Sequence, residues 1–484
     1  MNLAVKKHDL LNNVLVIGVG SIASKLLIFL LLPLVTRYLS KADFGFYELI
    51  ITSVQIFIPL ITLQMNDCLF RFLLDTKDDS ERSRIISNAF TIVGIWLSVC
   101  LILYLFYWII NQVYLQYQIN NNLFWLILIY AFGQTVFALW QQVARGNSNI
   151  RLFALSGVIS GVLIIGLTSL ATCFFQNHRL MVVVLAAVCA FLITIIFLEL
   201  RLKVLKSIKF KAINFNLQRE LIRFSLPLLP NSLSWWILHM ANRYIILYFS
   251  GIEAVATFSV ASKFAGWMTI INSIFITAWQ ESAIKESQSD ERGLFYSKTF
   301  AAYTKILFSA VMLFLPLVQL GYGLLVGSGY DNAREYIPML FLSSVFISFT
   351  SFFGVHYLST KKTMGALTTT VIGAIVNVVV LLLCYSKLGL SAVAIAQLIS
   401  GVVMSSLRYL DLRQTVPMQI DFKQLLGLLA GAIITILIYL SGNQALIAGS
   451  LLITLVLTLK LNQPIIVSTW NLFKPYLQKK AVEG

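Results

Sequence analysis

The sequence predicts an all-α integral membrane protein of about fourteen transmembrane helices. We expect two parallel six-helix repeats that form two lobes around a central cavity, followed by two C-terminal helices. Three features lead to this prediction: the composition, the length of the apolar runs and a repeated rhythm of spans. Apolar residues make up 58% of the 484 positions and charged residues only 12%, whereas soluble domains carry roughly 25% charged residues. So few charges cannot cover a water-soluble surface.

The apolar runs have the length of membrane spans, because crossing the hydrocarbon core takes ~20 helical residues. The first run continues into a second without a small-residue cleavage site, so we interpret it as a retained span and not as a signal peptide. Very short turns join the last two pairs of spans, which leaves the total between 12 and 14. The expected spans are 13–34, 45–65, 86–108, 122–143, 152–174, 179–199, 222–241, 254–278, 299–320, 336–357, 365–386, 390–408, 424–441 and 444–462.

The placement of basic residues predicts that both termini lie in the cytoplasm. Short cytoplasmic loops are enriched in Lys and Arg because positive charge resists translocation. The segment 201–223 alone holds seven of the 36 basic residues. All predicted outer loops together hold six, namely Arg37, Lys41, Arg179, Arg243, Arg334 and Lys387.

The net charge of +16 is explained by topology and by anionic lipid headgroups, so no nucleic-acid partner is expected. Five cysteines without CxxC spacing or paired outer-loop positions predict neither a disulfide framework nor a metal site. Four scattered histidines have no ligand or nucleophile spacing, and no phosphate-binding Gly-rich loop precedes a Lys. We therefore expect no cofactor and no direct use of ATP.

Two halves of the chain repeat the same rhythm of spans at an offset of 210 residues. At this offset Ser40 matches Ser250 and Asp43 faces Glu253. An even number of spans per half makes the repeats parallel, which is one of the two designs of secondary transporters. The predicted organisation is an N-terminal six-helix lobe over 1–199, a basic cytoplasmic linker over 200–221, a C-terminal six-helix lobe over 222–412, and two additional helices with a cytoplasmic tail over 413–484.

Helix-breaking residues occur at corresponding places in spans 1 and 7. Gly18 and Gly20 lie in span 1, and Pro227 and Pro230 lie in span 7. Interrupted spans at matching positions of two halves indicate a transport site, although Gly and Pro are also common in ordinary membrane helices. Both interpretations stay open, and the four residues are candidate hinges.

Several segments resemble the bacterial polysaccharide flippases of O-antigen, capsule and exopolysaccharide synthesis, whose superfamily includes the multidrug and toxic compound extrusion exporters. The opening hairpin over 29–47 carries this resemblance, as do the segment 224–236 and the later segments 330–338 and 389–396. The two extra C-terminal spans also suit the flippase branch. Relatives often have Asp before the span 7 Arg, where this chain has Asn242, so an acidic ion-coupling role there is in doubt.

The resemblance implies translocation of an undecaprenyl-diphosphate-linked oligosaccharide across the cytoplasmic membrane by alternating access. It also implies membrane lipids as partners, together with a polymerase and glycosyltransferases of the same pathway. Two other functions stay open. A small-molecule exporter is the first, and a membrane glycan polymerase or glycosyltransferase is the second. The short inter-span segments, about twenty residues at most and without a clustered acid pair, count against an enzyme.

Ionisable residues at membrane depth are costly and mark functional sites by default. Lys25 in span 1 and Lys263 in span 8 are the clear cases, and in the resembled fold their helices line the cleft. We therefore predict that both lysines bind the cargo diphosphate, with snorkelling toward an interface as the alternative. Arg37 and Arg243 close the outer ends of spans 1 and 7, where they contact either the cargo or lipid headgroups.

Arg71 and Glu281 lie at the same repeat offset, at the cytoplasmic ends of spans 2 and 8. Equivalent positions can approach each other across a pseudo-twofold axis. We therefore predict that the two residues form an inner gate that pairs when the cavity faces outward. Two solvated loop charges are the alternative.

Overall fold

The computed structural model describes residues 29–76, 78–111, 121–286, 290–359 and 363–464, together with Ala23, Leu26, Leu27 and Val467. Throughout this part of the chain the regular structure is helical and contains no strand. The predicted all-α class is confirmed. The chain divides into two compact units, Met1–Ser259 and Val260–Gly484.

Twelve helices within the described residues are long and apolar enough to cross a membrane, so the protein is a multi-pass membrane protein. The count of fourteen is not confirmed. Of the two remaining expected spans, 13–34 lies mostly outside the described residues, and 222–241 is divided into shorter helices. The twelve are α2 Lys41–Thr62, α4 Asp79–Ile110, α5 Asn121–Gly146, α6 Ile150–Phe174, α7 Arg179–Leu202, α12 Ile252–Lys285, α13 Arg292–Leu325, α14 Ile337–Ser359, α15 Thr363–Leu388, α16 Ser391–Arg413, α17 Phe422–Leu440 and α18 Gln444–Leu461.

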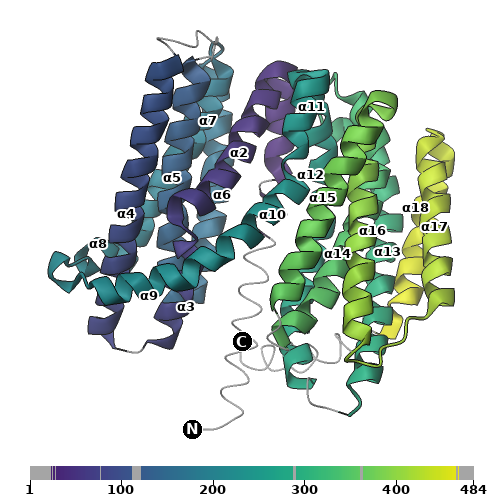
Figure 1. Cartoon of the computed structure of the whole chain (residues 1–484). Helices are drawn as coiled ribbons and strands as arrows, with labels where there is room; N and C mark the ends of the chain where they lie inside the picture. The colour runs from purple at the N-terminus through teal and green to yellow at the C-terminus, as the bar shows by residue number, and fades with distance from the viewer. Residues whose placement is uncertain are drawn as a thin grey trace, which may run out of the picture. The chain divides into compact units, whose positions relative to one another are not determined.

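Upright helices form most of the first unit. The helix α5 packs against α6 and α7, and also against α2 and the short helix α3, Met65–Asp75 (Figure 1). Trp140 donates a hydrogen bond from its indole Nε1 to the Glu199 carboxylate over 3.0 Å, which joins α5 to α7. The side chain of Phe191 on α7 stacks on Phe137 of α5 with ring centroids 5.4 Å apart.

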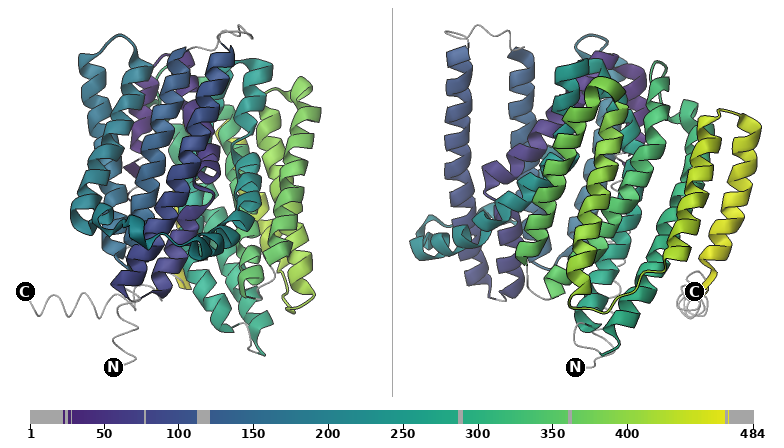
Figure 2. Two further views of the ribbon diagram at one scale, coloured as in Figure 1. Left: turned by 60° about the vertical axis from the view of Figure 1, so that its left-hand side comes forward. Right: turned by 45° about the vertical axis from the view of Figure 1, so that its right-hand side comes forward.

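The expected span 222–241 is interrupted twice. It consists of α9 Phe215–Ser225, a 3₁₀ turn at Leu226–Leu228, α10 Leu229–His239 and α11 Asn242–Ser250. Pro227 and Pro230 lie at the first interruption, where a proline ring removes a backbone donor and clashes with the preceding turn. The helix α9 therefore lies across the ends of α3 and α4 instead of continuing the span (Figures 1 and 2).

The helices α14, α15 and α16 form the densest packing of the second unit, and α17 and α18 both pack on α13. The buried side chain of Arg408 on α16 connects α16 to α14 and α15. It is 4% exposed and donates to the Thr350 carbonyl at 2.7 Å and to the Thr370 hydroxyl at 2.8 Å. A buried cation needs hydrogen-bond acceptors, and here residues of α14 and α15 accept from all three nitrogens of the guanidinium.

The division between the units falls inside α12, and α9 to α11 belong to the first unit. The predicted lobes over 1–199 and 222–412 were drawn from the repeated rhythm of spans. The boundary between two compact units need not coincide with the boundary between two sequence repeats. The lobe boundaries therefore stay predictions.

Candidate translocation site

The start of α2 is fixed by its capping residues. Ser40 accepts a hydrogen bond from the Asp43 backbone N–H at 3.0 Å, and its hydroxyl donates to the Asp43 carboxylate at 2.7 Å. This reciprocal pair satisfies an otherwise free donor of the first turn. The helix then places Glu48 inside the membrane-spanning segment 41–62.

A buried ion pair joins α2 to α11. The Glu48 Oε2 atom lies 3.4 Å from the Arg243 Nη2 atom, and the two side chains are 2% and 8% exposed. Arg243 also donates from Nε to the Ser259 hydroxyl over 3.2 Å. The pair is withdrawn from solvent, and its Glu48 lies on a helix long enough to span the membrane, where ionisable groups are expensive and mark functional sites.

A helix interruption puts Arg243 in this position. α10 ends at His239 and α11 begins at Asn242. Discontinuous membrane helices are typical of transporter binding sites because their ends expose backbone dipoles and unpaired peptide groups. Asn242 itself is fully buried, and neither atom of its amide has a hydrogen-bond partner among the described residues.

Polar contacts fasten α2 to the interrupted span. The Trp236 indole donates to the Thr52 carbonyl over 2.9 Å, and the Ser53 and Tyr244 hydroxyls lie 2.6 Å apart. Further along, the Gln64 amide contacts the Ser232 hydroxyl. Thr52 follows Glu48 by four residues, about one helical turn, so it lies on nearly the same face of α2. These contacts hold Glu48 opposite Arg243.

The remaining predicted cargo residues are not all visible. Lys25 lies outside the described residues, as do the predicted hinge residues Gly18 and Gly20. Arg37 is exposed near the end of the short apolar helix Phe29–Tyr38. Lys263 is half-buried in α12 and belongs to the second unit. Their binding roles therefore stay predictions.

Arg71, one of the two predicted gate residues, lies on α3 in the first unit. Its guanidinium lies 3.1 Å from the Asp75 carboxylate on the same helix, and both side chains are more than half exposed. Glu281 lies on α12 in the second unit. The predicted pair of Arg71 and Glu281 therefore stays a prediction, and in this structure Arg71 pairs within α3.

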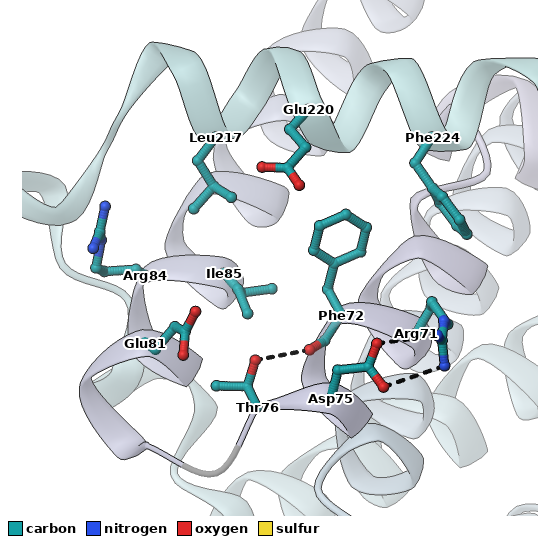
Figure 3. A pocket seen from close by; sticks show the side chains of 10 residues that line it. All are labelled: Arg71, Phe72, Asp75, Thr76, Glu81, Arg84, Ile85, Leu217, Glu220 and Phe224. Carbon is teal, nitrogen blue, oxygen red and sulfur yellow. Dashed lines mark hydrogen bonds and ion pairs between the residues drawn. The ribbon is translucent and has the colours of Figure 1, made fainter.

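A cavity of about 480 Å³ opens beside Arg71 between α3, α4 and α9 (Figure 3). Arg71 and Arg84 line it together with the acids Asp75, Glu81 and Glu220. Just beside it, Asp78 caps α4 by accepting the Ser80 backbone N–H at 3.2 Å, and its hydrogen bonds with Ser80 lower the pKa of the Asp78 carboxyl. Charges of both signs around one cavity do not select an anion or a cation.

Two buried charged residues were missed by sequence reasoning. Glu48 lies within the expected span 45–65, so the rule that selected Lys25 also applies to it. Arg408 stands at the end of the expected span 390–408, where long basic side chains commonly reach the membrane interface. Its burial depends on the packing of α14 and α15 around it.

The fold is similar to that of solved membrane flippases and multidrug exporters. A structure described as "Lipid II flippase MurJ, inward closed conformation" aligns with a TM-score of 0.70 at 14% identity, covering 96% of this chain and 100% of that one. An inward-facing multidrug resistance MATE family transporter of the MOP superfamily aligns with a TM-score of 0.60 at 15% identity, covering 82% and 94%. A crystal structure of MATE in complex with MaL6 aligns at 0.59 and 14%, covering 83% and 95%.

The family model described as polysaccharide biosynthesis protein matches residues 10–280, which is more than half of the chain. The chain belongs to the polysaccharide biosynthesis protein family, so its predicted resemblance to this family is confirmed, and its fold is similar to that of the MATE exporters. No curated protein sequence matches the chain.

Proposed function

We propose that this protein is a flippase for an undecaprenyl-diphosphate-linked oligosaccharide in the bacterial cytoplasmic membrane. It moves the cargo from the inner to the outer leaflet by alternating access, with both termini in the cytoplasm, and supplies surface polysaccharide synthesis. The family and the fold support this proposal. The observation that carries it is the buried pair of Glu48 and Arg243 at a helix interruption.

The chemistry of the cargo explains why a buried cation suits this function. The cargo combines a polar sugar, an anionic diphosphate and a lipid tail that stays in the bilayer. Arg243 presents a planar fork of donors that matches phosphate oxygens bidentately. We propose that Glu48 keeps Arg243 paired while no cargo is bound and that the diphosphate replaces Glu48 during transport. Exchange of one anion for another keeps the arginine charge compensated throughout.

A small-molecule exporter is the second candidate. Its support is the alignment with MATE transporters over more than four fifths of this chain. The two functions differ in their need for cations, because positive side chains in the cargo path repel the cationic compounds that an exporter of such drugs would carry. If the protein is a flippase, we propose a polymerase and glycosyltransferases of the same polysaccharide pathway as its partners. The exporter function implies no such partners.

A deletion strain separates the two candidates. A flippase predicts loss of surface glycan and accumulation of lipid-linked oligosaccharide on the cytoplasmic leaflet, both restored by the wild-type gene. Arg243→Gln should fail to restore either, at normal membrane abundance. Unchanged surface glycan together with altered drug tolerance in the deletion strain would contradict the flippase and favour the exporter.

A further inference from the structure

A second cavity, of about 390 Å³, lies at the inner end of the first unit where the chain enters α9. It is lined by Arg84, Lys209, Lys211, Ala212, Ile213 and Asn214. Three of these six residues are cations and none is an acid. Arg84 also lines the neighbouring cavity that holds Asp75, Glu81 and Glu220. The basic cavity thus has a cationic lining beside a cavity of mixed charge.

Buried side chains of α4 hold the backbone of this cavity in place. The Ser87 hydroxyl accepts the Lys209 backbone N–H at 2.9 Å. The Asn88 amide donates to the Ala212 carbonyl at 2.9 Å and accepts the Asn214 N–H at 2.8 Å. Ser87 and Asn88 are both 0% exposed. The segment is therefore hydrogen-bonded to α4 on both sides of Lys211. This holds the backbone that carries Lys209 and Lys211 in a preformed arrangement.

The three cations are not engaged in ion pairs among the described residues. Arg84, Lys209 and Lys211 are exposed, and within the described chain no acid forms an ion pair with any of them. Asn214 caps α9 by accepting the Leu217 N–H at 3.1 Å. The positive end of this 11-residue helix adds to the local field, which favours an anion such as phosphate.

Exposed apolar side chains flank the cavity. Leu205 is 59% exposed, Ile213 40% and Phe215 77%. In a membrane protein, apolar side chains next to a cluster of cations are typical of a segment that lies in the lipid interface. The ligand should then carry both a phosphate and a lipid tail, because the cavity suits the first and its apolar neighbours suit the second.

We infer that Arg84, Lys209 and Lys211 bind the phosphate headgroup of an inner-leaflet lipid. This site does not include Glu48, Arg243 or either predicted cargo lysine, and only its assignment to the inner leaflet rests on the proposed orientation. Two lipids share the required chemistry: a resident anionic phospholipid and a polyprenyl diphosphate.

The test uses native mass spectrometry of the purified full-length protein in detergent. Phosphatidylglycerol, phosphatidylcholine and undecaprenyl diphosphate are added separately at equal concentration. The cavity variant combines Arg84→Gln, Lys209→Gln and Lys211→Gln. The control variant combines Lys206→Gln, Arg219→Gln and Arg223→Gln, which removes the same charge from exposed residues of the same basic segment without touching the cavity lining.

We expect an anionic lipid to be retained better than phosphatidylcholine. The cavity variant should lose at least about tenfold in retention, since each cation beside an anionic headgroup contributes about fivefold, and the control variant should lose clearly less. Preference for phosphatidylglycerol identifies a resident lipid, and preference for the diphosphate identifies the cargo headgroup. Equal losses in the two variants, or equal retention of all three lipids, would overturn the inference. A thermal unfolding transition checks that each variant is folded. If the triple cavity variant is not folded, Lys211→Gln replaces it and Arg219→Gln becomes the control, and equal losses in the two or equal retention of all three lipids would again overturn the inference.

Discussion

Glu48 and Arg243 depend on each other at the residue scale because each compensates a charge that has left water. Removing one partner of a buried pair leaves an unpaired charge and costs about 3–5 kcal/mol, whereas replacing both is often neutral. We therefore expect Arg243→Gln to lower the thermal stability of the purified protein, and Arg243→Gln with Glu48→Gln to recover much of it. Neither variant should export glycan, since both lack the cation.

The matched control for stability is Arg71→Gln, whose ion pair with Asp75 is exposed and contributes only ~0–1 kcal/mol. Thermal unfolding in detergent gives the stability, and surface glycan gives the export. A double variant no more stable than Arg243→Gln alone would contradict the dependence of the two residues on each other.

Lys25 and Lys263 lead to a second prediction at this scale, which rests on their depth in the expected spans. If both bind the cargo diphosphate, Lys25→Met with Lys263→Met should abolish surface glycan at normal membrane abundance, because Met lacks the cation but is a good helix former. Arg at both positions should retain much of the export. Lys305→Met is the control, since Lys305 lies near the inner end of its expected span. Full export by the double Met variant would show that these lysines do not bind the phosphate.

At the scale of elements, close helix packing depends on the absence of a side chain at Gly45. A Cβ atom added there would overlap the Ile252 carbonyl oxygen at the start of α12. Gly45→Ala must therefore push α2 and the start of α12 apart, at a cost of about 1–3 kcal/mol. The thermal unfolding midpoint of the purified variant measures this loss.

Gly94→Ala provides the comparison within another membrane helix. No atom lies within 4 Å of a Cβ added at Gly94, and Ala favours a helix over Gly by up to about 1 kcal/mol. We expect this variant to be as stable as the wild type or more so. Equal stability of the two Gly→Ala variants would argue against close packing at Gly45.

Interrupted helices are the second feature of this scale. α2 ends at two consecutive residues with positive φ, Leu63 at 49° and Gln64 at 56°, a conformation that costs roughly 1–2 kcal/mol per non-glycine residue. The contact of Gln64 with Ser232 joins this interruption to the broken span, and the contact of Trp236 with Thr52 joins the same span to the middle of α2. These contacts therefore stabilise both the strained end of α2 and the interrupted span.

Orientation in the membrane is a property of the whole molecule, and cysteine labelling tests it. In a variant without the five native cysteines, Asn332→Cys should react with an impermeant thiol reagent in intact cells. Lys209→Cys should react only after lysis, because its segment is the most basic of the chain and is expected inside. Both side chains are exposed, so burial does not explain a difference. Labelling of Lys209→Cys from outside would overturn the proposed orientation.

The proposed inner gate also belongs to this scale. If Arg71 and Glu281 pair during the cycle, Arg71→Glu or Glu281→Arg alone should impair glycan export, and the combined exchange should restore part of it. Asp75→Asn is the control, because it removes the partner that Arg71 has in this structure without reversing a gate charge. Rescue no better than either single change would remove the gate from the mechanism.

Most of the fold could be predicted because a membrane span is recognised from the length of one continuous apolar segment of the sequence. Twelve of the expected spans correspond to long helices. The division of span 222–241 was only partly foreseeable: Pro227 and Pro230 marked the first interruption, whereas no proline or glycine marks the second at Met240 and Ala241. Of the candidate site, Arg243 was selected and Glu48 was not.

By itself the sequence determined the all-α membrane class of this protein, the length of its apolar runs and the bias of its basic residues, because these are local properties of the chain. Only the tertiary structure decided which acid faces Arg243, how Ser87 and Asn88 fasten a basic cavity, and why Arg408 is buried. Such partnerships depend on how each helix is rotated and packed against its neighbours. That rotation follows from contacts between residues up to about two hundred positions apart, such as Glu48 and Arg243, which no local pattern of hydropathy contains.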